Sequence, residues 1–317
     1  MEVMARRSNK WIIWLIGLVV ISGMGCEEEY IPDTIDSPTK LVVEGYVEAG
    51  EQPMPAYVIL TRSRSFFQKL NPGDLEGSYV HNALVQVSYD GITATLPEIC
   101  LNELDTTLRE VVAREFGFDP DSLQINICVY VDLSGQVVGQ FGKQYQLHVE
   151  AEGEVLEATT TIPELVPLDS FRFEPTPGTP IDSLAQLIAT VSDPADETNY
   201  YRQFIRINDG IYDPGFASVS DDALFNGKSL DFRINSPEDT PDENPEVFGL
   251  FHRGDTISIK WTNIDAEHFK FWNTFESSRN SGGPFSSYVR VSTNIQGGLG
   301  VWGGYAVAYY DAIVPEK

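Results

Sequence analysis

The sequence predicts a mostly β protein with two β-sandwich-like domains in tandem and one or two short inserted helices. Many short segments alternate apolar and polar residues, as strands with one buried face do. Turn signals such as Asp90-Gly91 separate these segments at regular intervals. A proline-rich stretch that begins at Pro163 divides the chain. We therefore expect an N-terminal domain over 40–165 and a C-terminal domain over 166–317.

The N-terminal domain opens with two segments of alternating pattern, 41–50 and 57–63. In the first, one face carries Leu41, Val43, Gly45 and Val47 and the other carries Val42, Glu44, Tyr46 and Glu48. Two hairpin patterns follow, over 82–96 and 146–162. Short strands joined by turns in this way are typical of a sandwich.

The pattern changes to helical spacing between Cys100 and Cys128. We expect a helical insertion over 101–117, with Asn102 as N-cap and Gly117 at its end. Its apolar face would consist of Leu101, Leu104, Leu108, Val111 and Val112. In an oxidising compartment the two cysteines are candidates for a disulfide that staples the ends of the insertion. Two separate buried thiols are the alternative.

The C-terminal domain contains further strand patterns and one helical pattern. Strands are expected at 184–194, 200–209, 255–264, 286–295 and 300–314. A helix near 265–278 would place Ile264, His268, Phe271 and Phe275 on one face. On that apolar face, His268 is interpreted as a histidine of the core.

No cofactor or metal site is predicted. Gly298, Gly300 and Gly303 fit G-x-G-x-x-G, but no helix pattern follows, so we interpret them as glycines that let strands bend or approach closely. The four histidines, His81, His148, His252 and His268, lack metal-ligand spacing. Several aromatic residues are candidates for a binding platform or, more commonly, for the core. They are Tyr200, Tyr201, Trp261, Trp272, Trp302, Tyr309 and Tyr310.

The charge balance excludes one class of partner. The chain has 47 acidic and 21 basic residues, a net charge of -26. Without residues 1–25 it would have 46 acidic and 18 basic residues, a net charge of -28. Binding to a phosphate backbone requires a basic surface, so nucleic acid is excluded as a partner.

The N-terminus has the layout of a secretory signal. Three basic residues within 6–10 precede an apolar segment over 11–21, which is too short for the ~20 residues of a membrane span. Cys26 stands where the mature chain should begin, which resembles a bacterial lipoprotein signal. We therefore expect a signal peptide over 1–25 and attachment of diacylglyceryl and palmitate-type acyl chains at Cys26, which anchor stably in membrane lipid. A free cysteine after an ordinary signal is the alternative.

Three glutamates, Glu27, Glu28 and Glu29, follow that cysteine directly. Such a run resembles the signal that exports Bacteroidota lipoproteins to the outer face of the outer membrane. The start of a solvated tether is the alternative. Residues 26–39 would then form the lipidated cysteine and an extended tether. We expect a lipid-anchored outer-membrane protein that faces the cell exterior.

Several segments together resemble the Bacteroidota lipoproteins labelled domain of unknown function 4249. They are KLVVEGYVEAG, VILTRSRSFF, QYQLHVEAEGEVLEATTTIP, DDALFNGK, NTFESS before GGPFSS, and NIQGGLGVWGGYAV. The resemblance runs from Lys40 to the C-terminus, and the segment from Cys100 to Cys128 departs from it. It implies an outer-membrane lipoprotein commonly encoded near a TonB-dependent transporter, without established catalytic residues.

These observations lead to three functional hypotheses. We expect a non-enzymatic binding or accessory subunit that works with a TonB-dependent transporter in nutrient uptake. The alternative is a structural or adhesive surface lipoprotein that needs no transporter. A glycoside hydrolase is less favoured, because it requires a cleft with converging carboxylates that 47 acidic residues alone do not identify.

Overall fold

The computed structural model describes residues 38–64, 71–118, 120, 125–178, 180–237, 246–280 and 289–317. One compact unit, residues 39–64 and 68–317, holds every helix and strand named below. The predicted signal peptide, Cys26 and the three glutamates after it lie outside the described residues. Within the described part of the chain, no helix combines the length and the apolar character that a membrane span requires.

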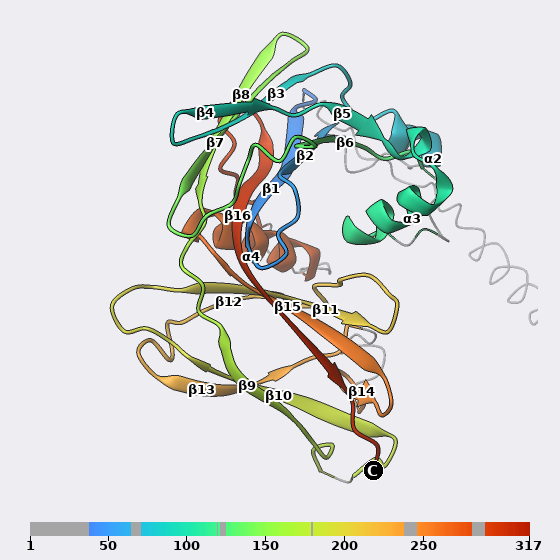
Figure 1. Ribbon diagram of the computed structural model, residues 1–317, viewed down its shortest axis with the longest axis vertical. Coiled ribbons are helices and arrows are strands. Elements are labelled where there is room, and N and C mark those ends of the chain that lie inside the picture. Colours follow the sequence, from blue (N-terminus) through green and yellow to red (C-terminus); the bar gives the residue numbers. More distant parts are fainter. Residues whose placement is uncertain are drawn as a thin grey trace, which may run out of the picture. The chain divides into compact units, whose positions relative to one another are not determined.

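An eight-stranded sheet runs through this unit (Figure 1). Its strand order is β12-β11-β15-β16-β1-β2-β6-β5. In chain order the bounds are β1 Leu41–Gly50, β2 Tyr57–Arg62, β5 Glu98–Cys100, β6 Cys128–Val131, β11 Tyr200–Ile207, β12 Val219–Asp221, β15 Thr256–Ile264 and β16 Leu299–Ile313. The sheet therefore joins strands from both halves of the sequence.

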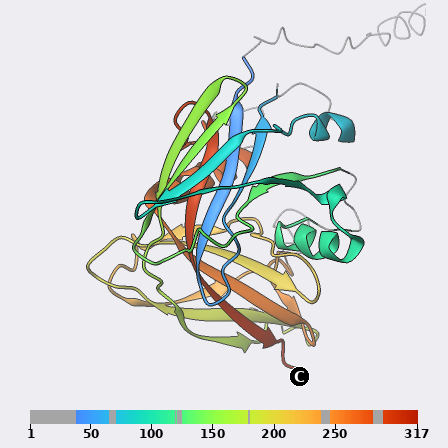
Figure 2. The ribbon, with the colours of Figure 1, turned by 45° about the horizontal axis from the view of Figure 1, so that its top comes forward.

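Strand β16 makes this sheet continuous, because it pairs with a different half of the chain on each side. It runs parallel to β1, with Leu299 opposite Val42, and the two strands lie side by side in Figure 2. It runs antiparallel to β15, with Ile313 opposite Thr256. Its 15 residues are long enough to serve both partners.

Two four-stranded sheets provide the second layers. The first has the order β4-β3-β7-β8, and the second has the order β13-β10-β14 with β9 on the other edge of β10. Their bounds are β3 Leu84–Tyr89, β4 Ile92–Thr95, β7 Gln144–Ala151, β8 Glu154–Thr161, β9 Leu168–Glu174, β10 Leu184–Ser192, β13 Ser229–Ile234 and β14 Phe251–His252. Each packs against a different part of the main sheet, as the two hydrophobic clusters show.

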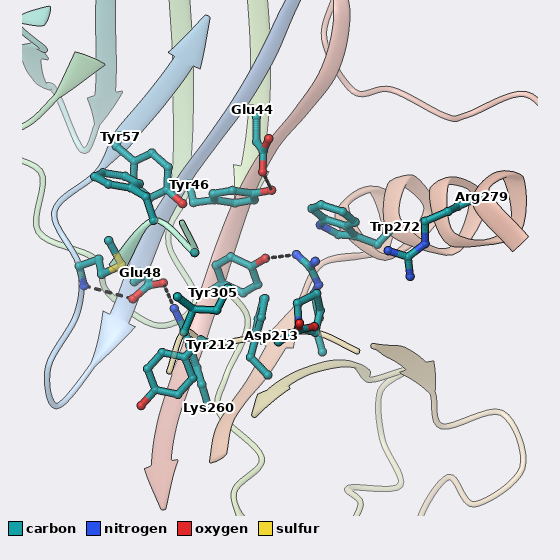
Figure 3. A pocket seen from close by; sticks show the side chains of 17 residues that line it. Glu44, Tyr46, Glu48, Tyr57, Tyr212, Asp213, Lys260, Trp272, Arg279 and Tyr305 are labelled. Atoms are coloured by element: carbon teal, nitrogen blue, oxygen red, sulfur yellow. Dashed lines mark hydrogen bonds and ion pairs between the residues drawn. The ribbon is translucent and has the colours of Figure 1, made fainter. Parts of the chain in front are cut away.

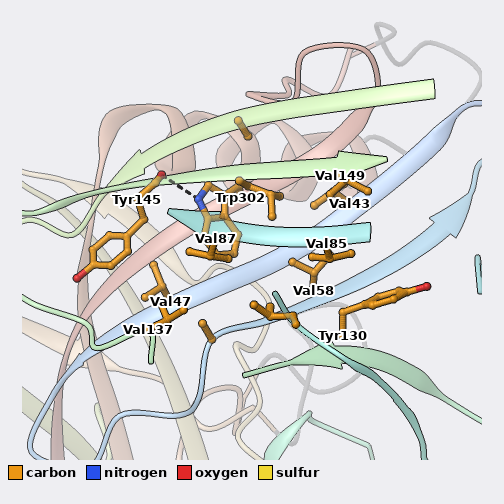
Figure 4. Packing of buried hydrophobic residues seen from close by; sticks show 14 of the residues in the cluster. Val43, Val47, Val58, Val85, Val87, Tyr130, Val137, Tyr145, Val149 and Trp302 are labelled. Atoms are coloured by element: carbon orange, nitrogen blue, oxygen red, sulfur yellow. Dashed lines mark hydrogen bonds between the residues drawn. The ribbon is translucent and has the colours of Figure 1, made fainter. Parts of the chain in front are cut away.

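The first cluster lies between β1, β2 and β16 on one side and β3 and β7 on the other (Figure 4). Trp302 is fully buried there among Val43, Val47 and Val87, and its indole N–H donates to the Tyr145 carbonyl at 3.1 Å. The second cluster begins at Val166 and is built from β10, β11 and β15. The predicted mostly β fold class is confirmed, and the two sandwich cores share one sheet.

The insertion consists of the 3-10 helix η1, Leu101–Glu103, and helix α3, Thr106–Glu115. A shorter helix, α2, spans Pro72–Glu76. Cys100 and Cys128 are joined by a disulfide between the paired strands β5 and β6. Buried Leu101, Ala113 and Ile127 pack beside Cys128 in a separate small cluster. The disulfide thus lies at the base of the insertion.

The predicted N-cap of the insertion is wrong. Asn102 belongs to η1, and the backbone is extended at Leu104, so the α-helix begins only after that residue. Asp105 is the N-cap of α3, and its carboxylate accepts a hydrogen bond from the Leu108 backbone N–H at 3.1 Å.

The strand predicted over 286–295 is also wrong for residues 289–295, which contain no strand. Residues 286–288 lie outside the described part of the chain. The Asn294 side chain takes the place of a ladder partner for β16. It donates to the Trp302 carbonyl at 2.7 Å and accepts from the Trp302 N–H at 3.0 Å. A side chain that bonds to backbone in this way competes with strand pairing.

Helix α4, Ala266–Asn280, covers part of the main sheet and corresponds to the helix expected near 265–278. Asp265 precedes it and accepts from the His268 backbone N–H at 2.9 Å. The other oxygen of the same carboxylate accepts from the Thr160 hydroxyl at 2.6 Å and from the Thr161 N–H at 2.9 Å. Asp265 therefore both caps α4 and fastens it to β8.

Candidate ligand-binding pocket

A pocket of ≈ 360 Å³ lies where strands of the main sheet meet α4 and the residues after α3 (Figure 3). The walls combine aromatic rings with acidic and basic side chains. The lining residues are Glu44, Tyr46, Glu48, Met54, Tyr57, Phe116, Gly117, Arg202, Phe204, Ile211, Tyr212, Asp213, Pro214, Lys260, Trp272, Arg279 and Tyr305. Its volume falls within the usual range of small-molecule sites.

Strand alternation explains why these residues share one face. Side chains at i, i+2 and i+4 of a strand point the same way. On β1, Glu44, Tyr46 and Glu48 line the pocket, while Val43 and Val47 between them enter the first hydrophobic cluster. The other pocket strands alternate in the same manner. The pocket therefore lies on the face of the main sheet that the two smaller sheets leave uncovered.

Aromatic rings form a connected wall around part of the pocket. The Tyr46 ring lies 5.6 Å from Tyr57 and 5.1 Å from Tyr305, centroid to centroid. Tyr57 in turn meets Phe116 edge to face at 4.5 Å. Because Phe116 follows α3, the disulfide-linked insertion supplies one end of this wall. Such pairs hold the rings in defined orientations.

Arg202 is only 3% exposed, and several contacts fix its side chain in place. Its Nε donates to the Ser218 hydroxyl at 3.1 Å, and its Nη1 donates to the Tyr305 hydroxyl at 2.5 Å. The guanidinium carbon lies 3.5 Å from the centre of a Trp272 ring and 4.5 Å from that of Phe204. No carboxylate among the described residues forms an ion pair with it.

Glu48 and Lys260 form an ion pair beside it, with side chains that are 3% and 10% exposed. The Lys260 ammonium donates to one Glu48 oxygen at 2.5 Å. The other oxygen accepts from the Met54 backbone N–H at 3.1 Å. These two charges neutralise each other within the wall of the pocket.

Glu44 is the acid most open to the pocket, since its side chain is exposed while protein surrounds it on several sides. One carboxylate oxygen accepts from the Tyr46 hydroxyl at 3.2 Å. Loss of solvation in this enclosed position raises the pKa of Glu44, although the Tyr46 hydrogen bond and the Arg202 charge oppose the rise. Within the described part of the chain, no cation pairs with Glu44.

A second hollow, of ≈ 520 Å³, shares Tyr212 with this pocket. Its basic residues already have protein partners. Arg114 donates to the Asp209 carbonyl at 2.6 Å, and Arg206 donates to the Ser258 hydroxyl at 3.3 Å. The first pocket is the better candidate site, because its charged side chains stand beside a wall of aromatic rings, whereas Tyr212 is the aromatic residue that lines the second hollow.

Comparison with protein-family models places almost the whole chain in one family. The model described as domain of unknown function (DUF4249) matches residues 27–311. The chain belongs to this family. No curated protein and no solved structure matches the chain. Every pocket residue, from Glu44 to Tyr305, lies inside the matched range. The pocket is therefore part of the DUF4249 domain.

The structure separates the aromatic residues singled out in the sequence of this DUF4249 protein. Tyr201, Trp261 and Trp302 are buried in the two hydrophobic clusters. Trp272 alone of that set lines the pocket. The remaining three, Tyr200, Tyr309 and Tyr310, are partly buried beside the clusters.

Most of the residues that line the pocket were missed by sequence analysis. They include Glu44, Glu48, Arg202, Lys260 and Tyr305. The signal that was available lay in β1, where charged and aromatic residues alternate with the buried valines. The alternation indicates that these residues share one face of the strand.

His268 of the DUF4249 domain lies in the core beside the pocket. Its side chain is fully buried and packs against the rings of Tyr46 and Tyr305, at centroid distances of 5.5 and 4.7 Å. Burial lowers the pKa of His268 to about 3, although the nearby Asp265 carboxylate opposes this shift. The imidazole is therefore neutral in the folded protein at ordinary pH.

This histidine should make the fold sensitive to acid. In the unfolded chain its pKa is near 6.5, so below that pH the unfolded state binds a proton that the folded state excludes. The stabilisation is complete above pH 6.5 and is lost as pH falls towards 3, at about 1.4 kcal/mol per pH unit. Urea unfolding at several pH values should show this extra slope in the wild type and not in His268→Asn. Parallel pH profiles for the two proteins would contradict the prediction.

Proposed function

We propose that this protein is a non-enzymatic, lipid-anchored outer-membrane protein that captures a small ligand at the cell surface. It would work with a TonB-dependent transporter in nutrient uptake. The observation that carries the binding role is the pocket, in which Glu44 and Arg202 each lack an ion-pair partner among the described residues. Charged side chains that line a pocket without ion-pair partners are suited to a ligand that supplies those partners.

The lipid anchor would make ligand capture near a transporter more efficient. A protein confined to the membrane surface has a far higher effective concentration at the mouth of a pore than the same protein free in solution. The excess of acidic residues would keep such a surface protein soluble. Affinity purification from solubilised outer membranes should recover a TonB-dependent transporter. Its absence would contradict the partnership and favour the structural or adhesive alternative.

Replacing Cys26 with serine should release the protein from cells, because serine offers no sulfur for the diacylglyceryl group. The measurement is the fraction of protein in the membrane pellet against the culture medium. A triple alanine variant of Glu27, Glu28 and Glu29 is the matched control. It should stay in the membrane but become inaccessible to protease added outside the cell. A Cys26→Ser protein that remains in the pellet would contradict lipid anchoring.

A substitution that narrows the pocket tests the binding role directly. Met54 lines it from a loop, so Met54→Trp should narrow it without disturbing a strand. Leu224→Trp is the matched control, because Leu224 is 93% exposed and outside the pocket. Protein isolated from cells should carry a small molecule in the wild type and in the control, and lose it in Met54→Trp. Equal retention by all three would contradict a role for this pocket.

A glycoside hydrolase is a second candidate, favoured by one observation. Glu44 has a raised pKa, as a general acid needs, and Glu48 lies on the same face of β1. The two residues are four positions apart on the strand, so their Cα atoms lie about 13 Å from each other. In addition, the Glu48 carboxylate already forms an ion pair with Lys260. This arrangement makes Glu48 a poor second catalytic carboxylate. Release of reducing sugar from oligosaccharides, abolished in Glu44→Gln, would decide for the enzyme.

A further inference from the structure

We infer that the pocket recognises a small organic zwitterion, namely an amino acid or a short peptide with a free ammonium and a free carboxylate. This inference rests on the proposed function and adds the chemical class of the ligand. It follows from the placement of Arg202 and Glu44, two opposite charges in one pocket that do not pair with each other.

Arg202 provides the place for the carboxylate. Its Nε and Nη1 donate to Ser218 and Tyr305, and its guanidinium carbon lies 3.5 Å from the centre of a Trp272 ring. The Ser218 hydroxyl donates in turn to Glu276 at 2.5 Å, so the hydrogen bonds connect that acid to Arg202 only through a hydroxyl. A guanidinium fixed in this way is preorganised to bind a carboxylate through charge-assisted hydrogen bonds.

Glu44 provides the place for the ammonium. It enters the pocket from β1 with the Tyr46 hydroxyl on one oxygen, and Figure 3 shows it on the same side as the Tyr46 ring. Its side chain remains open to solvent, so a ligand entering the pocket can reach the carboxylate. An ammonium bound there would restore favourable electrostatics for the charged form of Glu44. The neighbouring tyrosine ring adds a surface that attracts cations.

The charge pattern argues against the simpler classes of ligand. Glu48 and Lys260 cancel within the wall. Asp213 and Arg279 also line the pocket, and both bond to the backbone of residues 215–216. Glu44 and Arg202 are the two charges that we assign to the ligand. A simple anion would meet Glu44, and a simple cation would meet Arg202. A neutral sugar would remove water from both and neutralise neither, which is unfavourable. A zwitterion matches both charges.

The aromatic wall indicates what else the ligand carries. Tyr57, Phe116 and Trp272 line the same pocket as the two charges. An apolar or aromatic side chain on the ligand would pack against these rings and remain out of water. Phenylalanine and the dipeptide of two phenylalanines are therefore suitable probes, since each combines both charges with aromatic surface.

The inference is tested by titration calorimetry on purified protein with matched probes. Each zwitterion is compared with its N-acetyl form, which lacks the ammonium, and with its C-terminal amide, which lacks the carboxylate. At least one zwitterion should bind, and blocking either end should weaken it about tenfold or more, as expected for loss of a charge-assisted contact. Failure of both zwitterions to bind, or equal affinity of the blocked forms, would overturn the inference.

Two variants assign the ammonium to its partner. Glu44→Gln should weaken the zwitterion about tenfold and should not weaken the N-acetyl form, because that form is an anion that gains nothing from the Glu44 charge. Glu154→Gln is the matched control at an exposed acid on β8, outside the pocket, and should change neither affinity. Arg202 is probed through the amide instead, so the test does not depend on the folding of an Arg202 variant. Equal losses of both probes in Glu44→Gln would overturn the assignment.

The outcomes separate this inference from the proposed function. If the neutral sugar maltotriose binds, the zwitterions do not, and Met54→Trp abolishes the binding, the pocket still captures a ligand but the inferred class is wrong. If a zwitterion binds with the same affinity to Met54→Trp and to wild type, it binds elsewhere, and both proposals fail.

Discussion

Replacing Lys260 with methionine should destabilise the fold by about 3–5 kcal/mol, because it leaves the Glu48 carboxylate buried without its counterion. The two side chains are 10% and 3% exposed and directly paired. Met54 gives Glu48 one further hydrogen bond, which does not replace the lost charge. Chemical denaturation followed by tryptophan fluorescence measures the effect as a lower midpoint.

The double variant Glu48→Leu/Lys260→Met is the decisive comparison. Two apolar side chains of similar volume need no counterion, so most of the stability lost in Lys260→Met should return. Arg172→Met is the surface control. Arg172 contacts Glu174 and Asp231 at 2.8 and 3.0 Å, but solvent screens that cluster, so the midpoint should hardly move. A double variant less stable than Lys260→Met would show that the ion pair itself stabilises the fold.

The Glu48–Lys260 pair also shows why the pocket could not be predicted from sequence. The two residues are 212 positions apart, and each is an ordinary polar residue in an alternating strand. Alternation predicts which residues of β1 share a face, and Glu44, Tyr46 and Glu48 do share one. It does not predict which other elements approach that face. The approach of α4 and of the residues after α3 depends on tertiary packing alone.

The sheet topology could not be predicted from the sequence for a related reason. The pattern over 300–314 predicts a strand, and β16 is one, but periodicity carries no information on partners. Here β16 pairs in parallel with β1 from the other end of the chain. Two separate sandwiches were therefore a natural expectation from local patterns, whereas one shared sheet requires this long-range pairing. The insertion was easier to predict, because the change of period and the two cysteines both mark it locally in the sequence.

Gly300 is the position where that long-range pairing depends most on a single residue. Its φ is +101°, a backbone conformation that residues with a Cβ rarely adopt. A Cβ at this position would also collide with the backbone carbonyl of Val43, its partner on β1. The carbonyl belongs to the backbone and not to a flexible side chain, so the collision can be relieved only if the two strands separate. Close approach of the strands therefore explains the glycine in the middle of the G-x-G-x-x-G match, and nucleotide binding is not needed to explain it.

Gly300→Ala should therefore lower stability by several kcal/mol and loosen the junction between β1 and β16. Gly91→Ala separates the two causes, because Gly91 has a φ of +81° and no atom within 4 Å of the added Cβ. That control should lose only the conformational part, about 1–2 kcal/mol. Hydrogen exchange should show the excess loss in Gly300→Ala at the β1 and β16 amides, while the sheet of β9, β10 and β13 remains protected. Equal losses in the two variants would mean that the strands adjust to the collision, and that close approach is not what requires glycine here.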